Sequence, residues 1–158
     1  MENESSTTGA DATGEHKEVA LLQDRQGLEV LSWDECLDKL RHHSVGRVGF
    51  LDRGETVILP VNYAYIGASV LFRTTTGSIL HNVMMNDQMS FEIDEWDEEE
   101  RSGWSVLVKG QSVPVDDEWQ KTLFDTLGVD PWADAIERNE YVRIRADEIT
   151  GRRIVHLH

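Results

Sequence analysis

The sequence predicts a small, mainly β fold: a β-barrel with short helices at its periphery. Three observations predict it. Six or seven short β-type runs lie between Val45 and Leu157, separated by turn residues. Only three short segments have helical periodicity. The 158 residues, 39% of them hydrophobic, suit one folded unit with a core of ordinary size.

The first 27 residues differ in composition from the rest. They are rich in Glu, Ser, Thr, Gly and Asp and have almost no apolar residue before Val19, so they bury too little surface to offset the entropy of ordering. We expect residues 1–27 to be a disordered acidic tail and residues 28–158 to form the folded domain. The alternative is that the tail is a docking segment, but a tail of this composition is more often a solvated extension.

Charge and cysteine content limit the function classes. Fifteen basic and thirty acidic residues give a net charge of −15, which repels nucleic acid and anionic membranes. Any anionic ligand must therefore be held by local donors. Cys36 is the only cysteine, which excludes an intrachain disulfide and a thiolate metal cluster. No signal-peptide pattern and no run of about 18 apolar residues occurs. We therefore expect a soluble, cytoplasmic protein.

The first helix is predicted from Ser32 to the pair His42-His43. Ser32 and Glu35 fit a capping box, and helical spacing places four residues on one buried face: Trp33, Cys36, Leu37 and Leu40. On this face Cys36 is a small buried hydrophobe rather than a reactive thiol. Adjacent helical histidines point about 100° apart, so metal binding by the pair is the weaker interpretation.

Three antiparallel strands follow, within residues 45–52, 55–66 and 69–74, with turns at Asp52-Arg53-Gly54 and Gly67-Ala68. Pro60 lies inside the second strand and cannot donate to a sheet ladder. That strand should therefore be an edge, be bulged, or be open to a ligand on one side. The edge and the ligand interpretations carry comparable weight.

The remaining elements are assigned in the same way. A helix is predicted over residues 78–86, a strand over 88–96, a solvated acidic turn over 94–100 and a strand over 103–115. A helix over 117–127, stopped by Gly128, should direct Trp119, Leu123, Phe124 and Leu127 toward the core. Residues 141–145 and 149–157 form the last one or two strands, with a turn near Thr150-Gly151. His156 and His158 share a face, but two ligands rarely suffice for a metal.

The segment from Val57 to Leu80 is suited to holding a phosphate. A strand leads to Arg73 and a threonine triplet, and then to Ser78 at a helix start, where free N–H groups and the helix dipole favour an anion. Each residue also has a simpler role. Arg73 at a strand end is often a surface arginine, and threonines are good strand and turn residues.

Three blocks resemble a known family. VGRVGFLDRGETVILPVNYAYIGASVLFRTTTGSIL, FEIDEWDEEERSGWSVLVKGQ and YVRIRADEITGRRI are similar to the pyridoxamine 5′-phosphate oxidase-like proteins, which are flavin-binding split barrels, in their actinobacterial form. The resemblance extends from about Leu31 to Val155. It implies a six-stranded split barrel and a homodimer, with one flavin mononucleotide (FMN) in each of two clefts between the subunits.

The resemblance also implies site residues. The flavin ring would lie against one strand segment, Leu59, Pro60, Val61, Asn62 and Tyr63. The phosphate would be held by Arg73, Thr74, Thr75, Ser78 and position 79. The second subunit would complete the cleft with Trp104 and Ser105, and Arg143 would lie toward the substrate side. Relatives usually have lysine where this chain has Ile79, and loss of a charge-assisted contact costs roughly 1.5 to 3 kcal/mol, or about one to two decades of affinity.

These features predict an FMN-dependent oxidoreductase that transfers hydride between the flavin ring and a small-molecule substrate. The sequence has no Ser-His-Asp order and no His-Glu-x-x-His helix, and it identifies no catalytic residue and no metal ligand. The alternatives are a non-catalytic flavin-binding or sequestering protein, a cofactor-free dimeric barrel, and a deazaflavin- or haem-binding relative. Oxidation of pyridoxamine phosphate itself is not expected, because a basic set for a second phosphate is missing.

Overall fold

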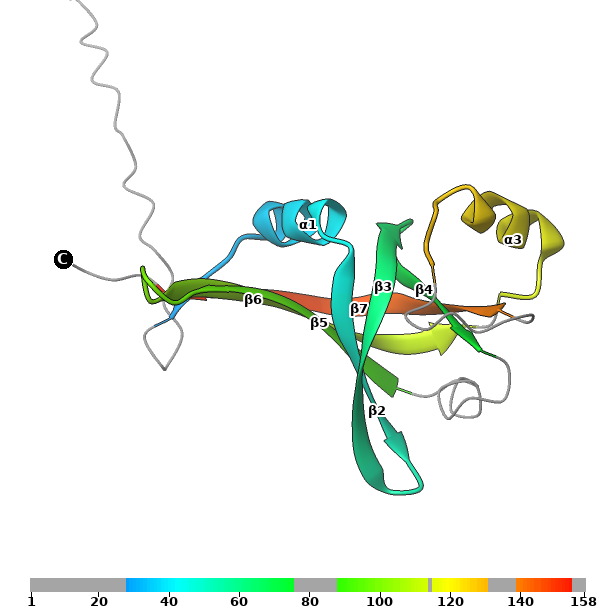
Figure 1. The fold of residues 1–158 in the computed structure, drawn as a ribbon, viewed down its shortest axis with the longest axis horizontal. Coiled ribbons are helices and arrows are strands. Elements are labelled where there is room, and N and C mark those ends of the chain that lie inside the picture. Colours follow the sequence, from blue (N-terminus) through cyan, green and yellow to red (C-terminus); the bar gives the residue numbers. More distant parts are fainter. Residues whose placement is uncertain (1–27, 76–87, 114, 131–138, 155–158) are drawn as a thin grey trace, which may run out of the picture.

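The computed structural model describes residues 28–75, 88–113, 115–130 and 139–154 (Figure 1). Several predicted features lie outside these residues. They are the acidic tail, the helix over 78–86 with Ser78 and Ile79, and the terminal histidines at 156 and 158. Within the described residues, no helix is long and apolar enough to cross a membrane.

The described chain forms one antiparallel sheet that closes on itself. Its strands are paired in the order β1-β7-β4-β3-β2-β5-β6, and a further pairing of β6 with β7 closes a ring of six. This confirms the predicted six-stranded barrel. The strands are β1 (Glu29–Val30), β2 (Val45–Asp52), β3 (Glu55–Ile66), β4 (Ser69–Thr75), β5 (Gln88–Asp97), β6 (Ser102–Val113) and β7 (Asn139–Ile154).

The first three strands of the ring are joined by the two predicted turns. Arg53 and Gly54 have φ of 51° and 84°, and Gly67 and Ala68 have φ of 55° and 56°. Positive φ at both central residues is the geometry of two-residue hairpin turns that match the twist of the strands. The two hairpins therefore form locally, as their sequence indicates.

The last strand differs from the prediction, because β7 runs without a turn through Thr150 and Gly151. It pairs with β4 over its first half and with β6 over residues 143–154. The glycine serves close packing instead. A Cβ on Gly151 would lie 2.6 Å from the Cys36 Sγ and 2.8 Å from the Leu31 Cδ1. The turn predicted at this glycine is thus wrong, and the residue marks the contact between helix α1 and β7.

Helix α1 (Trp33–His42) has the predicted capping box. The Ser32 N–H donates to Glu35 Oε2 at 2.8 Å, and the Glu35 N–H donates to Ser32 Oγ at 3.3 Å. Cys36 and Leu40 are buried, as expected for the apolar face. Trp33 is 56% exposed, which corrects its placement on that face. As the first helical residue it directs its side chain back toward the N-terminus, beyond the sheet.

Helix α3 (Glu118–Asp125) begins at Asp117, which accepts the Trp119 N–H at 2.8 Å. Of the four residues predicted to face the core, only Phe124 is buried, and Trp119 is 70% exposed. Leu123 and Leu127 are also exposed. The helix packs on the outside of the barrel, where Phe124 meets a small cluster of Leu71, Val115 and Tyr141. A helix this short, on an outer face, buries only one narrow stripe.

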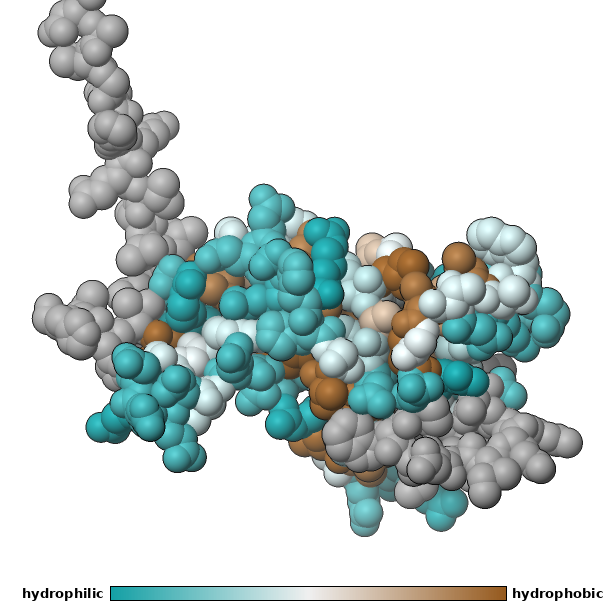
Figure 2. Space-filling view, turned by 45° about the horizontal axis from the view of Figure 1, so that its top comes forward, coloured by the Kyte–Doolittle hydropathy of each residue, from teal (hydrophilic) through white to brown (hydrophobic). Residues whose placement is uncertain are grey.

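The main core consists of side chains that point into the barrel from every second strand position. Residues 103–115 show the two faces predicted for them. Val106 and Val108 are fully buried, whereas Lys109 is exposed. The acidic turn between β5 and β6 is exposed, as expected. Figure 2 shows mostly hydrophilic surface on one face, with hydrophobic residues gathered in the middle and on the side of α3.

Tyr63 joins β3 to α1 through a buried hydrogen bond. Its hydroxyl donates to the Leu40 carbonyl at 2.8 Å, and its ring meets the Phe91 ring edge-on at 4.7 Å. Tyr63 is 4% exposed, and burial raises the pKa of its hydroxyl. The folded state therefore favours the protonated form of the Tyr63 hydroxyl.

We predict that Tyr63→Phe lowers the free energy of unfolding at pH 7 by about 1 to 2 kcal/mol, because the Leu40 carbonyl loses its partner. The raised pKa makes this contribution complete below the ordinary tyrosine pKa of about 10 and progressively lost as the pH rises above it. Urea unfolding of both proteins from pH 7 to 11 measures the difference. A difference that grows with pH would contradict this role.

We also predict opposite effects for two strand glycines. A Cβ on Gly110 would lie 1.8 Å from the Arg145 carbonyl oxygen, at the register shift between β6 and β7. Gly110→Ala should cost about 1 to 3 kcal/mol or more of unfolding free energy. A Cβ on Gly49 would meet nothing closer than 3.9 Å, so Gly49→Ala should be neutral or slightly stabilising. Equal effects in urea unfolding would contradict the close approach at Gly110.

Candidate functional site

The strand segment predicted to lie against a ligand has two distinct faces. Val61 and Tyr63 point into the barrel and are buried. Pro60 is exposed and Asn62 partly exposed on the outer face, in line with the exposed Ile58. The side chains of Val61 and Tyr63 are thus part of the core. Only their backbone could meet a ligand, and the outer face is formed by the even-numbered residues.

One side of this segment has a free backbone edge. The Tyr63 N–H donates to the Ser44 carbonyl at 2.9 Å, and hydrogen-bonded pairs alternate along an antiparallel ladder. Odd-numbered residues of β3 therefore bond to β2, and even-numbered residues direct their backbone groups away from it. Pairing with β4 begins only at Tyr63, so within the described chain no strand pairs with Ile58, Pro60 and Asn62 on that side.

This geometry explains Pro60. Pro60 pairs with Arg47 at a position where a backbone N–H would point away from β2. Because proline lacks that N–H, no hydrogen bond of the ladder with β2 is lost. Among the described residues β3 is thus unpaired on one side at Pro60, but it is not an edge strand, because it lies between β4 and β2. The ligand interpretation stays a prediction.

A wedge opens where β3 and β4 separate. Tyr63 pairs with Phe72, after which β3 continues along β2 and β4 continues along β7, with Arg73 opposite Tyr141. Asn62 and Arg73 therefore lie beside the wedge on the same outer face. The Asn62 amide donates to the Asp130 carbonyl at 3.1 Å, which brings the segment after α3 to the same place. No sequence pattern predicted this last contact.

Arg73 stands against an aromatic ring and has no carboxylate partner among the described residues. Its Cζ lies 5.0 Å from the centre of the Tyr141 ring, and its Nε is buried without a hydrogen-bond partner. The Tyr141 hydroxyl donates to Asp125 Oδ1. Burial and this hydrogen bond raise the pKa of Tyr141 to about 12. By contrast, Arg47, Arg145 and Arg153 each pair with a carboxylate.

The other residues predicted around the phosphate are placed less directly. Thr74 is buried, with its side chain on the opposite face from Arg73, and Thr75 is the last residue of β4. Ser78 and Ile79 lie outside the described residues. Of the members whose side chains the structure describes, Arg73 is the one that lies at the wedge on the outer face.

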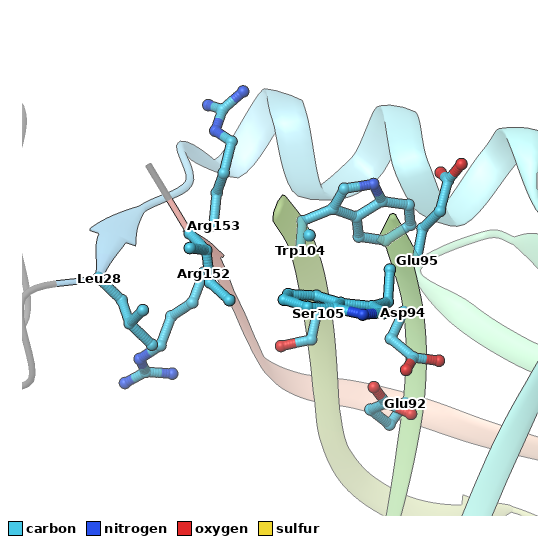
Figure 3. Close-up of a pocket in the computed structure, with 11 residues that line it drawn as sticks. Leu28, Glu92, Asp94, Glu95, Trp104, Ser105, Arg152 and Arg153 are labelled. Carbon is cyan, nitrogen blue, oxygen red and sulfur yellow. The ribbon is translucent and has the colours of Figure 1, made fainter. Parts of the chain in front are cut away.

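Trp104 and Ser105 lie on β6, beside the pocket drawn in Figure 3. The Lys39 Nζ lies 3.8 Å from the Trp104 ring centre, and the His43 ring meets it edge-on at 4.9 Å. Both partners come from α1 and its C-terminal cap, and Figure 3 shows Trp104 directed toward this helix. A hollow beside the pair is lined by residues of β5 and β7, among them Glu92, Asp94, Arg152 and Arg153.

The charges around this hollow are largely paired. Arg47 donates to Asp94 at 2.6 Å and to Glu92 at 3.4 Å. Burial, and next the neighbouring Asp94, raise the pKa of Glu92, which Arg47 opposes. Arg153 pairs with Glu29 and Glu35. The excess of carboxylates makes this hollow, within one chain, unfavourable for an anion.

The two groups of predicted residues are therefore far apart in one chain. Arg73 lies opposite Tyr141 on β7, whereas Ser105 lies opposite Arg152, eleven residues farther along the same strand. At about 3.3 Å per residue the two positions are more than roughly 30 Å apart. One chain alone does not bring Arg73 and Trp104 to the same ligand.

Comparison with known proteins identifies the family. Residues 32–153 match the family model described as pyridoxamine 5′-phosphate oxidase. An uncharacterized protein of Mycobacterium tuberculosis is 29% identical over 130 residues, which cover 79% of this chain and 84% of that protein.

Solved structures agree with this assignment. The FAD binding protein from Mycobacterium smegmatis is 33% identical with a TM-score of 0.68, covering 80% of this chain and 99% of that one. A conserved protein of unknown function from Corynebacterium diphtheriae is 35% identical with a TM-score of 0.68, covering 81% and 98%. The closed ring of six strands and the match over residues 32–153 lead to one conclusion: this chain belongs to the pyridoxamine 5′-phosphate oxidase-like family.

Proposed function

We propose that the protein is an FMN-dependent oxidoreductase of the cytoplasm, which acts as a homodimer on a small-molecule substrate by hydride transfer at the flavin ring. Family membership supports this proposal, as does the similarity to a protein from Mycobacterium smegmatis that is described as FAD binding. The family is named for the oxidation of pyridoxamine 5′-phosphate, which is not expected of this chain, and the name of the Mycobacterium smegmatis protein gives no substrate. The proposal therefore rests on the site.

One observation carries the proposal: the outer face of the wedge changes from apolar to cationic along its length. Ile58, 65% exposed, and Pro60 present an apolar surface at one end. Asn62 follows, and Arg73 with its unpartnered Nε lies at the other end. A planar, largely apolar ring that carries an anionic phosphate tail has the matching distribution of polarity.

The residues divide the task between them. The free backbone groups of Pro60 and Asn62 would bond to the polar edge of the ring and fix its orientation. The Arg73 guanidinium would bind the phosphate, to which its fork of donors is suited. When bound, the flavin supplies the hydride chemistry, and the protein supplies binding and orientation. This division is consistent with a site that contains no recognisable catalytic triad.

The distance between Arg73 and Trp104 supports the homodimer. Because one chain holds them more than roughly 30 Å apart, both can meet one cofactor only if Trp104 and Ser105 come from a second chain. A symmetric pair of chains would then form two equal clefts, since each chain gives its wedge to one cleft and its Trp104 to the other.

FAD is the alternative cofactor, because the Mycobacterium smegmatis protein is named for FAD. The same name favours flavin binding without catalysis as the second candidate function. Thr75, Ser78 and Ile79 remain proposed contacts of the phosphate group, and the replacement of the family lysine by Ile79 should weaken the binding of either nucleotide.

We predict that the purified protein carries bound flavin and that Arg73→Gln lowers its flavin affinity about ten- to hundredfold, because a charge-assisted contact to the phosphate is lost. Absorbance of the folded protein, chromatography of the released nucleotide and titration with FMN and FAD provide the measurements. Turnover of NADH or NADPH with an added acceptor distinguishes an oxidoreductase from a binding protein.

Arg145→Gln is the matched control, because Arg145 is an exposed arginine of the adjoining strand that already pairs with Asp147 at 3.1 Å. It should leave the affinity unchanged. A colourless protein that binds neither added nucleotide would refute the proposed function. Equal affinity of the Arg73→Gln variant and the wild type would refute the assignment of the phosphate to Arg73.

A further inference from the structure

We infer that Arg143 is a second phosphate-binding residue, which acts together with Arg73 on the same anionic group. This inference rests on the proposed function and deepens it. The resemblance to the family suggested a place for Arg143 toward the substrate, whereas the sheet register places it beside Arg73.

The register puts the two arginines on one face. Arg73 of β4 lies opposite Tyr141 of β7, and Leu71 of β4 lies opposite Arg143. Paired residues of a sheet share a face, and so do residues two apart on one strand. Arg73 and Arg143 are therefore diagonal neighbours on the outer face, with a separation of about 7 to 8 Å between their backbone positions. Two arginine side chains at this spacing can reach one phosphate group.

Neither guanidinium group has an ion-pair partner among the described residues. The Nε atoms of Arg73 and Arg143 are buried without a hydrogen-bond partner, and neither arginine forms an ion pair with a described carboxylate. The positions on either side of Arg143 across the sheet are apolar, Leu71 on β4 and Val113 on β6. The carboxylate on this face near Arg73 is Asp125, which accepts the Tyr141 hydroxyl.

This arrangement is unfavourable unless an anion binds. Two half-buried like charges at diagonal positions repel each other, and buried donors without partners lose the hydrogen bonds they would make in water. The chain has 30 acidic and 15 basic residues, so carboxylates that could neutralise the pair are abundant in the sequence. Asp125 is held by the Tyr141 hydroxyl. No described carboxylate forms an ion pair with Arg73 or Arg143, which points to an exogenous anion as their partner.

A phosphate group is the anion that fits best. Two guanidinium forks provide several N–H donors in fixed directions, which suits the oxygens of a phosphate ester dianion or of a diphosphate. FMN carries the first and FAD the second. In either case Arg143 would supply a second cation in a chain that lacks the lysine found in relatives.

Titration of the intact protein with riboflavin, FMN and FAD tests the inference. Arg143→Gln should weaken the binding of FMN and FAD about ten- to hundredfold and should change riboflavin binding less than about threefold, since riboflavin has no phosphate. A larger loss for FAD than for FMN would identify the diphosphate as the preferred group. Arg145→Gln, two residues away on the same face of β7, should leave all three affinities unchanged.

A purely structural role for Arg143 predicts that its replacement lowers the stability of the flavin-free protein, whereas the inference predicts no such loss. The flavin-free Arg143→Gln variant should have an unfolding midpoint equal to or above that of the wild type, because an unpaired cation stabilises nothing in the free protein. Equal FMN affinity of variant and wild type would overturn the inference and leave the proposed function standing. A loss of riboflavin affinity together with a lower unfolding midpoint of the flavin-free variant would also overturn the inference. A wild-type protein that binds no flavin would overturn the proposed function itself.

Discussion

The division of β3 between two partners is the constraint on which the candidate site depends. Its residues 55–62 pair with β2 and only its last four residues pair with β4, because β4 turns away to follow β7. The ring of strands still closes through the pairing of β6 with β7, although β3 and β4 are hydrogen-bonded over only part of their length. The unpaired backbone around Pro60 is the consequence, and a free edge of this kind is what proteins ordinarily cover or use.

The distribution of charge is a second condition for the candidate site. In a chain with a net charge of −15, three of the described arginines pair with carboxylates: Arg47 with Asp94, Arg145 with Asp147 and Arg153 with Glu35. Arg73 and Arg143 have no carboxylate ion pair among the described residues, and they are diagonal neighbours on β4 and β7. An acidic protein can hold an anion only where its own carboxylates are kept away. On the outer face of β4 and β7, Asp125 accepts the Tyr141 hydroxyl and leaves the two arginines without an ion pair in the described chain, whereas the hollow beside Trp104 has an excess of carboxylates.

Local sequence signals predicted the fold well. The capping box at Ser32 and the two hairpin turns depend only on neighbouring residues, and each was confirmed. Errors arose where tertiary contacts decide. Gly151 was interpreted as a turn but serves the packing of Cys36, and Trp119 lies on a helix that buries only one residue. The candidate site was predicted in part. The resemblance named Asn62, Arg73 and Arg143, but the diagonal position of Arg143 beside Arg73 depends on strand register, which no single segment encodes.

The central claim, that each cleft takes its wedge from one chain and its Trp104 from another, is tested most directly by mixing two inactive variants. Arg73→Gln and Trp104→Ala homodimers should each bind flavin poorly. After they are unfolded together and refolded, half of the dimers are mixed, and each mixed dimer has one cleft with neither substitution. The account predicts that about one quarter of all clefts regain wild-type affinity in a flavin titration. Absence of any high-affinity fraction in dimers shown to be mixed would contradict a shared cleft.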